Sequence, residues 1–136
     1  MANEAVIIEL LGNGGDVVRF TVDNAVAVAK GTLMYLSADP RTTAATAADG
    51  NIFVGIASEE KVANDGKTDL GVYTHGIFDL VDSGAGMTLG DIAKINGANL
   101  LATADEAGAQ GVKEEVGLVL ETTDVGERVA VLINKP

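Results

Sequence analysis

Hydrophobic and polar residues along this chain form short segments of strand length. In Val17–Val22, the polar Arg19 and Thr21 alternate with apolar residues, which is the period-2 pattern of a half-buried strand. Further strands are predicted where short apolar runs lie between turn residues: Val26–Lys30, Leu33–Leu36, Ile52–Ala57, Leu70–Thr74 and Gly76–Leu80. The connecting segments predict a turn at Asn64–Lys67, one helical turn at Ser58–Glu60 and a loop of small residues at Thr42–Gly50.

The second half of the chain repeats this order of segments. Gly90–Ile95 follows the pattern of Gly31–Leu36, Val116–Val119 that of Val54–Ala57, and Arg128–Ile133 that of Leu70–Thr74. A second loop of small residues, Ala102–Gly111, takes the place of Thr42–Gly50. The sequence therefore predicts an all-β fold, a compact barrel or sandwich that is built from two similar β-units and closed to hide its edges.

The N-terminal segment differs from the rest of the chain. Ala5–Leu11 is apolar apart from one acid, and Gly12–Gly15 forms a flexible joint after it. We therefore expect an arm and joint at residues 1–15 and a single β-domain at 16–136. Such an arm can be the first strand of its own sheet, or it can pair with another protein. The segment lacks the basic region of a signal peptide, and we expect synthesis in the cytoplasm without export.

Composition excludes several classes of partner. The formal net charge is −11, and the sequence has no cluster of Lys and Arg, so binding to nucleic acid or to a membrane surface is not expected. The chain has no cysteine, which rules out disulfides and thiolate metal sites. With three phenylalanines and no tryptophan, the core must be mostly aliphatic, and an aromatic platform for sugars is poorly supplied.

Candidate chemistry is sparse. His75 is the single histidine, and strand geometry does not gather it with Asp79 or Asp82 into a catalytic cluster. The glycines of Gly12–Gly15 precede a strand, whereas a phosphate loop precedes a helix. The acidic turn Asn64–Asp69 contains Lys67 and lacks the terminal glutamate of a calcium loop. We therefore expect no enzyme activity, no cofactor and no metal.

The order of four segments resembles that of tailed-virus capsid decoration proteins. These segments are Gly31–Leu36, a Thr/Ala-rich loop, Asn51–Ala57 and Leu70–Thr74. These bacteriophage proteins are also called head-stabilising or cement proteins, and the lambda-type head decoration protein is a relative. The resemblance covers most of the chain after residue 15.

The resemblance implies a β-tulip-like domain that assembles as a homotrimer on the outer surface of the expanded icosahedral head. There it would bind the major capsid protein and hold the shell against the internal pressure of packaged DNA. Ala5–Leu11 matches the position of the capsid-binding arm, which implies five capsid-contact residues: Val6, Ile7, Ile8, Leu10 and Leu11. Val6, Ile8 and Leu10 would fill pockets from one face of an added strand.

Two other functions remain open from the sequence. A surface adhesion or carbohydrate-binding β-module would need an exposed groove with aromatic residues or calcium. A small hydrolase or isomerase in a β-barrel would need acids clustered near His75 in a pocket.

Overall fold

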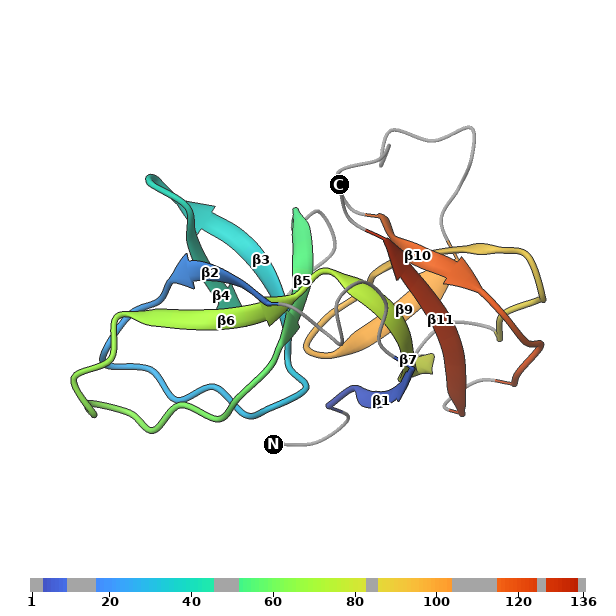
Figure 1. The fold of residues 1–136 in the computed structure, drawn as a ribbon. Helices are drawn as coiled ribbons and strands as arrows, with labels where there is room; N and C mark the ends of the chain where they lie inside the picture. Colours follow the sequence, from blue (N-terminus) through green and yellow to red (C-terminus); the bar gives the residue numbers. More distant parts are fainter. Residues whose placement is uncertain are drawn as a thin grey trace.

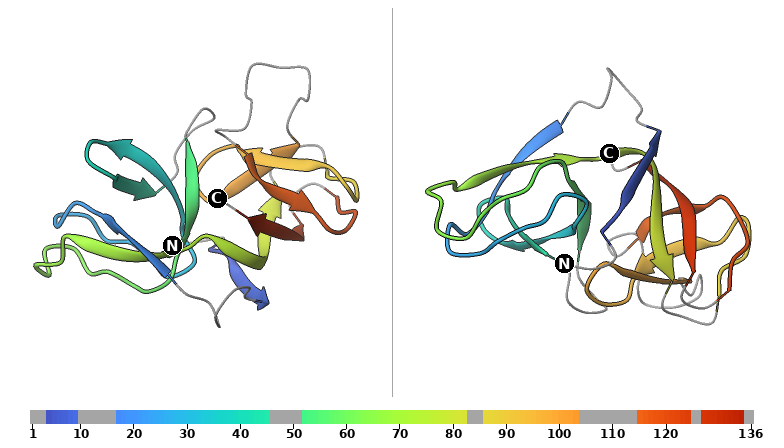
Figure 2. Two further views of the ribbon diagram at one scale, coloured as in Figure 1. Left: turned by 45° about the horizontal axis from the view of Figure 1, so that its top comes forward. Right: turned by 90° about the horizontal axis from the view of Figure 1, so that it is seen from below.

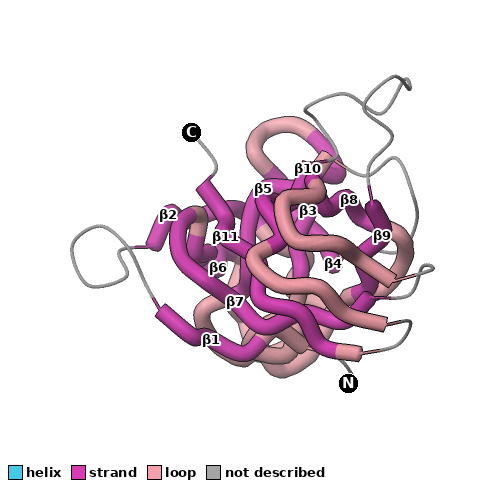
Figure 3. The backbone as a smooth tube through the Cα atoms, turned by 90° about the vertical axis from the view of Figure 1, so that its right-hand side faces the viewer, coloured by secondary structure: helices cyan, strands magenta, loops and turns pink. Residues whose placement is uncertain are grey.

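The computed structural model describes residues 4–9, 17–45, 52–82, 86–103, 115–124 and 127–134. Within these ranges every residue lies in a strand, a turn or a loop, and no helix is present (Figures 1 and 3). No helix of the described part is therefore long and apolar enough to cross a membrane. The described residues form eleven strands: β1 Val6–Glu9, β2 Val17–Thr21, β3 Leu33–Ala38, β4 Thr42–Ala45, β5 Phe53–Ala57, β6 Asp69–Tyr73, β7 His75–Asp82, β8 Ile92–Ile95, β9 Leu100–Thr103, β10 Glu115–Val119 and β11 Arg128–Asn134.

The strands after β1 form two barrels that lie side by side (Figures 1 and 2). Barrel 1 closes in the order β2-β4-β3-β5-β6. Barrel 2 has the order β7-β11-β10-β8-β9, and pairing of β9 with β7 closes it. The all-β fold from two similar units is confirmed. Each unit closes on itself, whereas the sequence favoured one closure for the whole domain.

The two barrels have the same topology, which confirms the repeat found in the sequence. In each barrel, the first strand pairs antiparallel with the fifth strand. The first strand also pairs in parallel with the third strand, with Thr21 opposite Thr42 in barrel 1 and Val81 opposite Leu100 in barrel 2. The loops also correspond, because the isolated bridge Val28–Lys61 has its counterpart in Met87–Thr123.

One apolar core continues across the junction of the barrels. Barrel 1 has a small interior that contains Met34, Leu70 and Val72. Its Leu33, Phe53 and Ile56 belong instead to the larger core of barrel 2. A buried hydrogen bond crosses the same junction, where the Leu33 amide donates to Asn99 Oδ1 at 2.9 Å. The larger core is therefore built from residues of both barrels.

Three local predictions differ from the structure. Thr42–Ala45 and Leu100–Thr103 are strands within or beside the predicted loops, because closing each barrel needs a third strand and small residues fit there. Val26–Lys30 gives only an isolated bridge, since the Val26 carbonyl accepts from a lysine side chain rather than from a neighbouring strand. Ser58–Glu60 is not helical, because Ser58 Oγ donates to the Gly71 carbonyl across the sheet.

Candidate interaction surface

Strand β1 joins barrel 2 as an additional edge strand. It pairs antiparallel with β7, with Val6 opposite Asp79 and Ile7 opposite Phe78 (Figure 2). Ile7 packs against the core of barrel 2. Val6 and Ile8 face outward, and 52% and 53% of their surfaces are exposed. The alternation along the strand thus leaves two aliphatic side chains in solvent at a sheet edge, where another strand can be added.

The residues before β1 attach the arm to both barrels. The Ala5 amide donates to the Gly31 carbonyl of barrel 1 at 2.6 Å. Arg128 of barrel 2 donates from Nη2 to the Glu4 carbonyl at 2.6 Å, while its Nε contacts Asp79 Oδ2 at 3.1 Å. This ion pair on neighbouring strands therefore also holds the arm backbone.

Of the sequence-predicted contact residues, Val6, Ile7 and Ile8 lie on β1. Val6 and Ile8 share the outward face, as the alternation predicted, and Ile7 points the other way. Leu10 and Leu11 lie outside the described residues, as do the joint Gly12–Gly15 and the expected domain boundary at residue 15.

Two pockets flank the segment where the arm crosses barrel 1. One, of about 350 Å³, lies between the arm and the junction and includes Ala5, Gly31, Ile56 and Tyr73. The other, of about 370 Å³, is lined by Glu4, the segment Ala27–Lys30, Glu60 and Lys61. Residues of the arm line both pockets.

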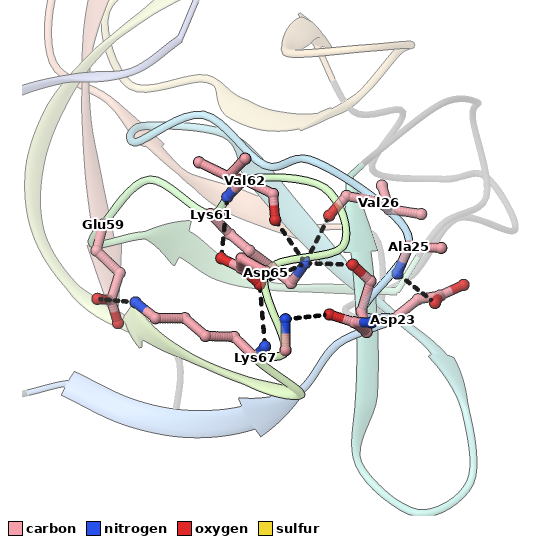
Figure 4. A network of polar contacts seen from close by, with 10 residues as sticks. Asp23, Ala25, Val26, Glu59, Lys61, Val62, Asp65 and Lys67 are labelled. Atoms are coloured by element: carbon pink, nitrogen blue, oxygen red, sulfur yellow. Dashed lines mark hydrogen bonds and ion pairs between the residues drawn. The ribbon is translucent and has the colours of Figure 1, made fainter.

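A buried lysine organises the polar loops of barrel 1. Lys61 is buried, and its Nζ donates to the carbonyls of Asn24 at 2.8 Å, Val26 at 2.9 Å and Val62 at 3.2 Å (Figure 4). It also forms an ion pair with Asp65 Oδ1 at 3.4 Å. Because every bond of this ammonium group is made within the protein, Lys61 ties loops together and is not presented to a ligand. No sequence signal indicated this role.

The acidic turn considered for calcium uses its carboxylate internally. Asp65 accepts from the backbone amides of Lys67 at 3.0 Å and Val62 at 3.2 Å. The Lys67 amide, and then the nearby Lys61 ammonium, lower the pKa of Asp65 below its ordinary value. In the equivalent turn of barrel 2, the Asp124 amide and the Thr123 hydroxyl lower the pKa of Glu127. Within the described ranges, no three His, Asp or Glu side chains gather to hold a metal.

The side chains considered for catalysis have separate partners. His75 is exposed at the start of β7, and its Nδ1 lies 3.0 Å from Thr74 Oγ1. Asp79 is engaged by Arg128, and Asp82 is buried in barrel 2. The structure does not bring these three residues together, as strand geometry predicted.

Comparison with known proteins gives a likeness of fold. No family model matches the chain, and no curated protein matches it. Among solved structures, it is similar to the N base of the head fiber protein gp8.5 in bacteriophage phi29. The TM-score is 0.57 at 18% identity, over 87% of this chain and 94% of that chain. The shared architecture thus extends over nearly all of both chains.

Proposed function

We propose that the chain is an auxiliary capsid protein of a tailed bacteriophage, which binds the outer surface of the expanded head and stabilises it. The observation that carries the proposal is the fold shared with the base of a phage head fiber over almost the full length of both chains. The sequence resemblance to decoration proteins points to the same kind of particle. The net charge of −11 suits the exterior of a DNA-filled shell, because an acidic protein is repelled by DNA.

The proposed contact with the major capsid protein is centred on β1. Its position at the sheet edge allows strand addition, in which main-chain hydrogen bonds give affinity. The exposed Val6 and Ile8 side chains supply an apolar face for the partner. Leu10 and Leu11 are proposed to extend this contact. We further propose that copies associate as a homotrimer on the shell, where many weak contacts add up.

Co-sedimentation with expanded, undecorated capsids of the source phage tests the proposal. The protein should pellet saturably, near one copy per major capsid subunit. Val6→Asp with Ile8→Asp should reduce the occupancy strongly while the circular dichroism spectrum stays unchanged. Val62→Asp is the control, since Val62 is also an exposed aliphatic residue and lies on barrel 1. Failure to bind any maturation state of the shell would overturn the proposal, and a glycan screen would then test the adhesion alternative.

A further inference from the structure

The internal repeat provides two equivalent glycines, Gly31 in barrel 1 and Gly90 in barrel 2. Each donates its amide to the strand beside it, Gly31 to the Ala57 carbonyl and Gly90 to the Val119 carbonyl, both at 2.9 Å. Their φ angles are 90° and 91°, in the region that favours glycine. The backbone around the two positions therefore has the same form.

In barrel 1, the backbone at Gly31 binds an extended segment, the N-terminal arm. The Ala5 amide donates to the Gly31 carbonyl, and the arm passes so close that a Cβ on Gly31 would lie 2.5 Å from the Ala5 carbonyl oxygen and 2.9 Å from Glu4 Cβ. Position 31 therefore requires glycine both because its φ angle is positive and because the arm passes too close for a Cβ atom.

At Gly90 the equivalent space is empty in the part of the chain that the structure describes. A Cβ built on Gly90 would have nothing within 4 Å. The neighbouring side chains show the same contrast. Ile56, beside the arm in barrel 1, is 1% exposed, whereas its counterpart Leu118 is 38% exposed. Leu89, which takes the place of Lys30, is 64% exposed.

We propose that the exposed surface around Leu89, Gly90 and Leu118 binds an extended aliphatic segment of a partner protein. The segment would place a small residue over Gly90, as Ala5 does over Gly31, with aliphatic residues after it. The site is on barrel 2 and is distinct from the β1 contact of the proposed function. The occupant is not the arm of a second copy, because each arm is already held by Gly31 and β7.

The side chain at position 89 also specifies the partner residue before the small one. In barrel 1 this position is Glu4, which lines a pocket together with Lys30. Leu89 replaces that lysine in barrel 2, so this surface favours an aliphatic side chain over an acid. Burial of one such side chain corresponds to about a tenfold change in affinity.

Two dye-labelled peptides test the site against the full chain by fluorescence anisotropy. One has the sequence of residues 3–9, and the other carries leucine in place of Glu4. The leucine peptide should bind about tenfold more tightly, because it adds an apolar contact with Leu89. Leu118→Glu and Leu89→Glu should each weaken its binding about tenfold, and both changes lie on the surface, where the fold tolerates them.

Val62→Glu is the control and should leave peptide binding unchanged. Equal binding by the Leu118→Glu variant and the control would place the peptide elsewhere, for instance where the protein's own arm lies, and would overturn the proposal. Absence of binding by the leucine peptide at millimolar concentration would overturn it as well. Neither result depends on capsid binding by β1.

Discussion

Lys61 and Thr123 occupy equivalent positions in the two barrels, and each contacts a carboxylate four residues later. Lys61 forms an ion pair with Asp65, and Thr123 Oγ1 donates to Glu127 Oε1 at 2.9 Å. The equivalent turns of the two barrels are thus stabilised by an ion pair in barrel 1 and by a hydrogen bond in barrel 2. The difference is that the longer lysine reaches beyond its turn to the Asn24 and Val26 carbonyls of a second loop.

We expect Lys61→Met to lower the free energy of unfolding by about 3 kcal/mol, because it removes the buried ammonium group that donates to the Asn24, Val26 and Val62 carbonyls. Thr123→Val should cost much less, since it removes one hydrogen bond to an exposed carboxylate. Urea denaturation of both variants measures the difference. Equal losses would mean that the ammonium contacts with the second loop do not stabilise barrel 1.

At the scale of elements, β5 and β10 each cross a neighbouring strand at a glycine. A Cβ on Gly55 would overlap the Tyr73 carbonyl, and one on Gly117 would overlap the Leu132 carbonyl. Both clashes are with backbone of the strand that follows in the barrel, so they cannot be relieved by a rotamer change. The glycine in each Val-Gly strand is therefore required by close packing of the two strands.

We expect Gly117→Ala to destabilise the protein by about 3 kcal/mol, because a backbone strand would have to move. Gly66→Ala is the control. Gly66 has φ of 87° but nothing within 4 Å of a Cβ, so this change should cost only the conformational term, about 1 kcal/mol. Thermal unfolding of the two variants compares them, and a smaller shift for Gly117→Ala would contradict the packing argument.

Elements with strong apolar patterns could be predicted from the sequence, and those defined by long-range contacts could not. Residues 17–22, 52–57 and 70–74 alternate or are uniformly apolar, and they form β2, β5 and β6. Thr42–Ala45 is a strand only because β3 and β2 lie beside it, which local composition does not encode. The outward face of β1 followed from alternation. The open space that the described residues leave at Gly90 could be found only by knowing that the arm fills the equivalent place at Gly31.

At the scale of the whole molecule, barrel 1 depends on barrel 2. Its own interior is small, and three of its largest apolar side chains lie in the shared core: Leu33, Phe53 and Ile56. If the barrels separated, these side chains and the bond from Leu33 to Asn99 would be exposed to water. That penalty makes independent unfolding of either barrel unfavourable.

We therefore expect one cooperative unfolding transition, with equal calorimetric and van't Hoff enthalpies. Phe53→Ala should lower the free energy of unfolding by about 3–5 kcal/mol and should affect both barrels, because Phe53 lies on a strand of barrel 1 and its side chain packs in the core of barrel 2. Hydrogen exchange at the buried amides of Met34 and Val131 reports on barrels 1 and 2 respectively. Equal losses of protection at the two sites would follow from the shared core. A loss confined to Met34 would show that the barrels unfold separately despite the apolar core and the Leu33–Asn99 bond between them.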